Sequence, residues 1–221
     1  MSPAIHRIII GAIAIAVSAI RADACYTGLT IIPTAEVLDH GEYGIEQQFD
    51  GTFPLRGAGT QTLDTEFGIL PRWEAGIDFD LTDECESGLL LNAKCLICPC
   101  GKHRPALAIG LCNAGAGVAS SPYLVATKDF GGPRAHLGVV RTDGRNRWFV
   151  GADFAVNDRL TLMADYVSGS ENSSSAGISY QFDDRFGVLA GVMFPNARGQ
   201  DAGFTLHLVL NGPFSTIEKG D

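Results

Sequence analysis

The sharpest group of side chains with chemical potential lies between positions 95 and 103. Cys95, Cys98 and Cys100 are followed by His103, and three thiolates with one imidazole can close a tetrahedral zinc site. The spacing matches no standard pair of zinc knuckles, and an exported chain meets oxidants before it meets free zinc. Disulfides or free structural thiols are therefore favoured over a metal site. The cysteines concerned are Cys85, Cys95, Cys98, Cys100 and Cys112.

A second group consists of charged residues that recur on one face of the predicted strands. Such a row indicates either a cation-preferring or proton-coupled pore lining, or a paired network that fills a narrow lumen, because unpaired buried charges are costly. Both interpretations stay open for a barrel of this size. The acidic members are Glu46, Asp64, Glu66, Glu74, Asp78, Asp80, Asp153 and Asp165, and the possible partners are Lys94, Lys128, Arg134, His136 and His207.

Catalysis has little support in the sequence. Acyl-transferring barrel enzymes need a serine close to a histidine, and neither His136 nor His207 has a serine motif of that kind nearby. The sequence predicts a non-enzymatic protein without a cofactor, and a lipid-modifying barrel enzyme remains the alternative.

These residues lie on a pattern of alternating apolar and small or polar side chains. Residues 147–156 (RWFVGADFAV) place Trp148 and Val150 on one side, and Phe149 and Asp153 on the other. A period of two predicts strands, and the short turns between them predict sequential antiparallel hairpins. The chain is thus expected to be all-β, with about 12 strands. We expect them at 43–49, 63–69, 73–81, 89–94, 107–111, 123–128, 135–139, 147–156, 160–166, 175–182, 186–194 and 203–210.

The composition of the two faces favours a transmembrane up-and-down barrel over a secreted soluble barrel that carries a ligand. The second face is rich in glycine, alanine, serine and threonine, and the whole chain has four lysines. The first face is aliphatic in its middle and aromatic towards strand ends, which is how a barrel meets lipid. The alternation also puts Cys95 outward and Cys112 inward, which disfavours a disulfide between them.

Loop lengths are expected to alternate with strand number. Short turns such as Asn157-Asp158 and Asp183-Asp184 would face the periplasm, and longer loops such as 168–173 and 195–201 the exterior. Two connections depart from this rule: 98–104 is long, and 143–146 is short.

The termini fit an exported barrel. Residues 1–24 are predicted to be a signal peptide, residues 25–211 an outer-membrane barrel of a Gram-negative-type bacterium, and residues 212–221 a tail. Cys25 at the cleavage point raises lipid attachment as an alternative. A net charge of −9 disfavours nucleic acid as a partner. The expected partners are outer-membrane lipids and the barrel-assembly machinery, because residues 201–208 are similar to the signal carried by a last strand.

The segment YTGLTIIPTAEVLDHGEYGIEQQFDG (26–51) resembles the N-terminal segment of YjbH-type outer-membrane proteins. That resemblance implies a part in exopolysaccharide production or export. The sequence therefore predicts a small-solute channel or an accessory of surface polysaccharide, with residues 26–41 as a short extended lead-in to the first strand.

Overall fold

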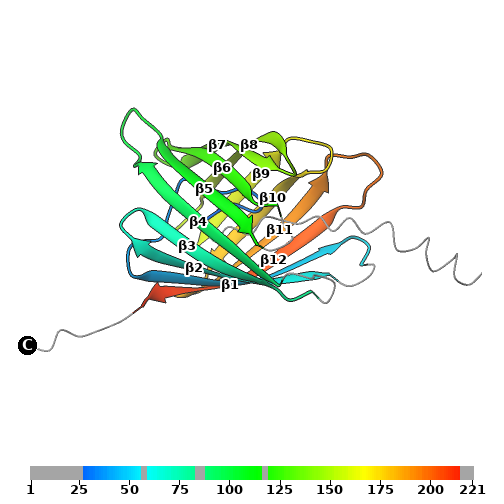
Figure 1. Ribbon diagram of the computed structural model, residues 1–221, viewed down its shortest axis with the longest axis horizontal. Coiled ribbons are helices and arrows are strands. Elements are labelled where there is room, and N and C mark those ends of the chain that lie inside the picture. Colours follow the sequence, from blue (N-terminus) through cyan, green and yellow to red (C-terminus); the bar gives the residue numbers. More distant parts are fainter. Residues whose placement is uncertain (1–26, 56–58, 83–87, 116–118, 215–221) are drawn as a thin grey trace, which may run out of the picture.

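The chain forms one closed barrel of twelve antiparallel strands, as predicted (Figure 1). The computed structural model describes residues 27–55, 59–82, 88–115 and 119–214. Each strand pairs with the next along the chain, and β12 closes the sheet on β1. The strands are β1 (Glu42–Thr52), β2 (Thr60–Leu70), β3 (Trp73–Asp80), β4 (Leu89–Cys98), β5 (Ala106–Ala114), β6 (Ser121–Asp129), β7 (Pro133–Thr142), β8 (Arg145–Ala155), β9 (Leu160–Val167), β10 (Ser173–Gln181), β11 (Phe186–Pro195) and β12 (Gly203–Pro213).

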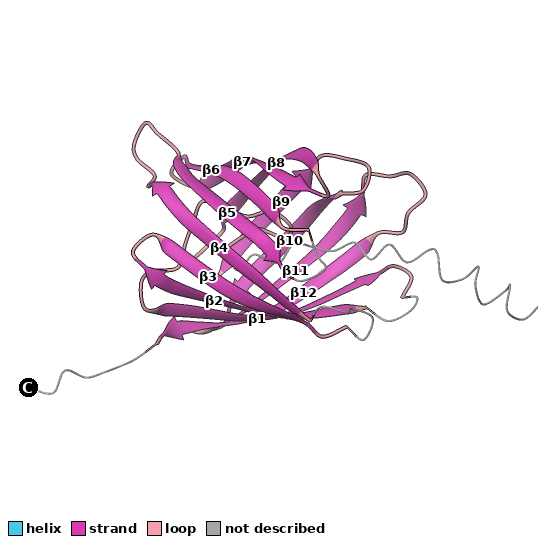
Figure 2. Cartoon of the chain, in the orientation of Figure 1, coloured by secondary structure: helices cyan, strands magenta, loops and turns pink. Residues whose placement is uncertain are grey.

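Regular structure in the described ranges is entirely strand (Figure 2). Within them, no helix has the length and apolar character to cross a membrane. The predicted signal peptide and Cys25 lie outside the described residues.

The two faces have the predicted composition. The outer face is aliphatic at mid-height, where Leu162 and Ile178 are nearly half exposed. Aromatic pairs flank it at both ends: Trp148 packs on Tyr166 with ring centroids 5.1 Å apart, and Phe182 stacks on Phe186 at 5.3 Å. An apolar belt between two aromatic belts is the pattern of a barrel exterior that faces lipid.

The connections sort by length as expected. We call the end that carries the connections β2–β3, β6–β7, β8–β9 and β10–β11 the turn end, and the opposite end the loop end. The tight β7–β8 turn at the loop end has positive φ at Asp143 and Gly144, +49° and +73°. Two consecutive residues of this kind match the twist of a two-residue hairpin. The long β4–β5 connection at the turn end follows Cys98.

Two turns at the turn end are stabilised by the same pattern of side-chain to backbone hydrogen bonds. The Asp183 carboxylate accepts hydrogen bonds from the backbone N–H groups of Arg185 and Phe186, both at 2.8 Å. The Asn157 side-chain oxygen accepts from the corresponding groups of Arg159 and Leu160 at 2.9 and 3.0 Å. The two N–H donors lower the pKa of Asp183, because they stabilise the charged carboxylate.

The barrel runs slightly further than the sequence indicated. Strand β12 continues to Pro213, and the Phe214 N–H donates to the Gly41 carbonyl at 2.7 Å. The Phe214 ring stacks on Phe67 at 5.2 Å. Residues 212–214, assigned to the tail from sequence, therefore belong to the barrel wall.

Candidate functional site: the barrel lumen

The segment predicted as an extended lead-in lies inside the lumen. Residues 27–41, called here the internal segment, start with a tight hairpin: the Leu29 N–H donates to the Ile32 carbonyl at 2.8 Å, and the Thr34 N–H to the Thr27 carbonyl at 3.2 Å. Ile32 and Ala35 are 1% exposed. The segment is the blue trace within the ring of strands in Figure 1.

The internal segment enters from the turn end. The Gly41 N–H donates to the Gly68 carbonyl near the end of β2, 2.9 Å away. The hairpin tip lines one recess together with Thr142 and Ser173, which lie at the loop-end termini of β7 and β10. The segment thus extends through much of the height of the lumen.

Glycines on the inner face make room for this segment. A Cβ at Gly151 would lie 2.6 Å from Ile32 Cδ1, and one at Gly177 would lie 2.6 Å from Thr30 Oγ1. At Gly191 the added Cβ would lie 2.6 Å from Thr30 Cγ2. Real Cβ atoms do not approach other heavy atoms so closely. A larger residue at any of these three wall positions would therefore clash with the internal segment.

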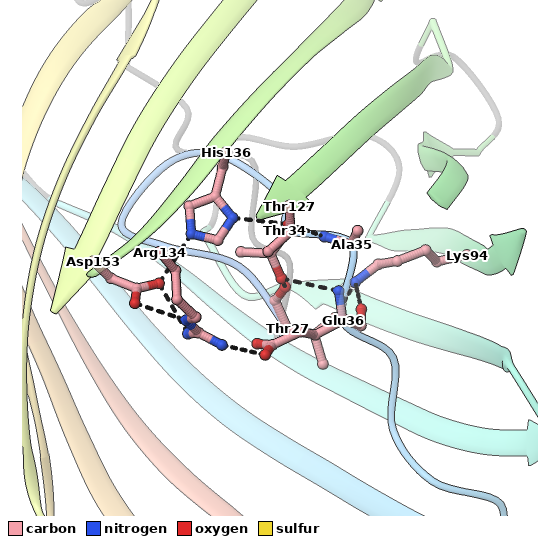
Figure 3. Close-up of polar contacts among 9 residues, drawn as sticks. All are labelled: Thr27, Thr34, Ala35, Glu36, Lys94, Thr127, Arg134, His136 and Asp153. Atoms are coloured by element: carbon pink, nitrogen blue, oxygen red, sulfur yellow. Dashed lines mark hydrogen bonds and ion pairs between the residues drawn. The ribbon is translucent and has the colours of Figure 1, made fainter. Parts of the chain in front are cut away.

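One anchor of the segment is an ion pair in the wall. Lys94 Nζ lies 2.8 Å from Glu74 Oε1, and both side chains are almost completely buried. The same ammonium donates to the Glu36 carbonyl at 2.7 Å and contacts the Thr27 hydroxyl. Glu74 accepts from Thr27 Oγ1 at 2.8 Å and from the Leu38 N–H at 2.9 Å. The pair therefore bonds both arms of the segment. Figure 3 shows Lys94 beside Thr27 and Glu36.

A second anchor lies on β6, β7 and β8. Arg134 forms a two-pronged pair with Asp153, with N–O distances of 2.8 and 2.9 Å, and also contacts the Glu36 carboxylate. His136 bridges Asp153 Oδ2 at 3.0 Å and Thr127 Oγ1 at 2.9 Å. The Thr127 hydroxyl in turn accepts from the Ala35 N–H at 2.9 Å. Figure 3 shows these side chains gathered around Ala35 and Glu36, in the second arm of the hairpin.

Near the hairpin tip, the wall supplies one more bond. Asp165 accepts from the Ile31 N–H at 3.2 Å and from the Ser175 hydroxyl. Wall carboxylates thus bond backbone groups of the segment that would otherwise be buried without partners.

The wall from β12 to β4 is acidic. Glu46, Asp64 and Asp78 are direct cross-strand neighbours in register, and all three are buried. Glu46 lies 2.7 Å from His207 Nδ1, and Asp78 accepts from the Asn92 amide. Acidic side chains on this wall therefore outnumber its buried basic partners, His207 and Lys94.

Most of the predicted charge network lines the lumen. Glu46, Asp64, Glu66, Glu74, Asp78, Lys94, His136, Asp153, Asp165 and His207 are buried on the inner face, with Arg134 beside them. Asp80 lies at the rim, where it accepts from the Thr82 N–H at 2.9 Å.

Lys128 was wrongly placed from sequence. The inner position of β6 is Thr127, and Lys128 is on the opposite face. Its ammonium donates to the carbonyls of Gly101 and Lys102 at 2.7 and 3.1 Å, so it holds the long β4–β5 connection.

The sequence prediction missed Asp50, Thr127 and the internal residues Thr27 and Glu36. Asp50 is in phase with Glu46 on β1 and bonds Gln48 at 2.7 Å, so the period of two was a usable signal for it. Thr27 and Glu36 gave no local signal, because their partners in the wall are 47 or more residues away in the chain.

The described cysteines are free thiols. Cys95, Cys98, Cys100 and Cys112 form no disulfide with one another, and Cys85 lies outside the described ranges. Cys95 pairs with Ile109 on the outer face and Cys112 is buried inside, as the alternation predicted. Among the residues that the structure describes, no three histidine, cysteine or acidic side chains are placed to hold a metal ion.

Comparison with known proteins places the fold among porins. The structure is similar to the KdgM porin, with a TM-score of 0.57, 9% identity, and coverage of 76% of this chain and 98% of that one. It is also similar to the KdgM porin in complex with disordered oligogalacturonate (TM-score 0.56, 9%, 76% and 98%) and to the NanC porin (0.53, 9%, 77% and 98%). No protein-family model and no curated protein matches the sequence.

Proposed function

We propose that this chain is an outer-membrane channel for small solutes, and that its internal segment holds the channel closed. The observation that carries the proposal is a closed twelve-strand barrel with an apolar, aromatic-belted exterior and a charged lumen. A soluble barrel would need the reverse arrangement. Export by the signal peptide of residues 1–24 and insertion by the barrel-assembly machinery are parts of the same proposal.

Closure follows from the filling of the lumen. Ile32 and Ala35 in the segment are each 1% exposed, and the wall side chain Lys94 that contacts the segment is also buried, so the segment occupies space that a passing solute would need. Removal of the segment would expose the wall residues that it now covers. Conduction in this proposal therefore requires the segment to leave the wall, at least in part.

The acidic side chains of the wall are expected to select solutes by their charge. Glu46, Asp64 and Asp78 lie in one row, and a lumen of one sign of charge concentrates ions of the opposite sign. The KdgM porin has been solved with an oligogalacturonate, which is acidic. For this chain, the acidic row favours cationic and uncharged solutes over acidic ones.

A link to surface polysaccharide is a second candidate. The residues that resemble YjbH-type proteins, 26–51, include the whole internal segment and most of β1. In this candidate, the segment would serve a polysaccharide-export assembly rather than gate a free channel. Conductance that appears only in the presence of such an assembly would favour it.

Planar-bilayer conductance tests the channel. The full chain is compared with a form that starts at Asp39 and so lacks residues 27–38 of the segment. Each form is first shown to be folded by a gel mobility that changes on boiling. The full chain should give a low baseline with brief openings, and the shortened form a steady, cation-selective conductance. If the shortened form does not fold, Lys94→Met in the full chain serves instead, with openings expected to be longer. Folded barrels that conduct in neither form contradict the proposal.

A further inference from the structure

A small recess opens at the loop end of the lumen, above the tip of the internal segment. It has a volume of about 50 Å³, with Ile31, Ile32 and Pro33 as its floor. Tyr123 and Phe149 contribute aromatic walls. A water needs at least about 10–15 Å³ of such volume, so the recess holds about four waters or one edge of a sugar-sized ring.

The recess combines an apolar floor with buried hydroxyl groups. Ser121 and Ser173 line it and are 2% and 3% exposed. Within the described structure, Ser173 Oγ has no hydrogen-bond partner. Buried hydroxyl groups are nearly always bonded, so this oxygen marks a position where a bound molecule gains a hydrogen bond.

The charged side chain that lines the recess is already paired. Glu171 lines the recess, and its carboxylate pairs with Arg147. The guanidinium uses Nη2 for this pair, whereas its Nε has no hydrogen-bond partner within the described structure. Arg147 does not itself line the recess, so the described residues that line it offer no unpaired cation to an acidic solute. The acidic residues deeper in the barrel disfavour anions further.

We propose that this recess binds one end of a small uncharged solute that carries both a hydrocarbon face and hydroxyl groups, that is, a neutral sugar. The C–H face of the ring rests on Ile32 and Phe149, and a ring hydroxyl bonds Ser173. The inference deepens the proposed function and rests on it, because such a solute would enter the channel from this end. The bound solute also touches the tip of the element that closes the lumen.

Saturation-transfer NMR on the full chain in lipid nanodiscs tests the site, since detergent tails would compete for the apolar floor. The probes are D-glucose and D-galacturonate. Glucose should bind saturably and more tightly than galacturonate. Ser173→Ala should weaken glucose binding by about 3–10-fold, the usual worth of one hydrogen bond.

Two tryptophan variants separate the recess from the rest of the barrel. Thr142→Trp fills the rim of the recess and should abolish binding. Val139→Trp, on the outer face of the same strand, should bind like the wild type. Equal glucose binding by all variants, or tighter binding of galacturonate, would overturn the proposal, as would no saturable binding by the wild type. Because binding is measured without transport, a channel that conducts but does not bind glucose removes only this inference.

Discussion

Lys94 Nζ lies 2.8 Å from Glu74 Oε1, directly across the β3–β4 ladder, and the same ammonium donates to the Glu36 carbonyl 2.7 Å away. One wall pair thus joins two strands and the internal segment. The internal segment is therefore held to the wall by specific polar contacts.

Lys94→Met leaves the buried Glu74 carboxylate without its ion-pair partner. Removing one member of a buried pair typically costs about 3–5 kcal/mol, and we expect a loss of this size in denaturant unfolding. The double variant Lys94→Met/Glu74→Gln should recover part of that loss. The single variant should also expose the internal segment to protease. Lys102→Met, at an exposed position of the β4–β5 connection, is the control. A protease-resistant segment in Lys94→Met would show that the pair does not anchor it.

Gly191→Ala tests the close fit between wall and segment. The added Cβ would lie 2.6 Å from Thr30 Cγ2, and overpacking of this kind costs roughly 1–3 kcal/mol. Thr30→Ser removes that methyl group, so the double variant should regain most of the stability. Gly132→Ala is the control, because its nearest new contact is an ordinary 3.7 Å to Phe154. If Thr30→Ser gives no rescue, the internal segment is not packed on Gly191.

The turn at Asp183 should make stability depend on pH. Backbone N–H groups of Arg185 and Phe186 hold the pKa of Asp183 below its ordinary value. Its contribution is therefore complete above the unfolded pKa, about 4, and lost as the pH falls through the lower folded pKa. The stability gap between the wild type and Asp183→Ala, measured by urea titration, should narrow below about pH 4. Asn157→Ala, in the turn with the same bonds but no charge, should cost the same at every pH. A gap for Asp183→Ala that is flat with pH would refute this.

Neighbouring residues of β12 test which face meets lipid. Leu208 is on the outer face and Val209 on the inner face, opposite Glu46. Leu208→Lys should cost about 2–4 kcal/mol in lipid, because the ammonium loses water and finds no partner. Val209→Lys should cost less, since a carboxylate is within reach. The inner position Thr205 makes a poorer comparison, because it is buried against His207. The opposite order of costs would invert the faces.

The barrel could be predicted from sequence because its signals are local. Alternation along single strands identified the inner face of β8 at Asp153 and of β12 at His207, and short turns gave the strand order. The location of the internal segment could not, because Ala35 and Ile31 bond residues 92 and 134 positions away. The glycines at 151, 177 and 191 were visible as an inner-face pattern, but only the folded chain shows what fills the space. Lys128 was misplaced because the alternation at the end of β6 was weak.

The most direct test of the account is a reversible tether between segment and wall. Ala35 and Thr127 are joined by a 2.9 Å hydrogen bond, so Ala35→Cys with Thr127→Cys, in a background without the native cysteines, should form a disulfide in the folded barrel. Single-channel openings should vanish in the oxidised protein and return on reduction, while Thr127→Cys alone should be indifferent to the reductant. Openings that persist when the disulfide has formed would contradict closure by the internal segment.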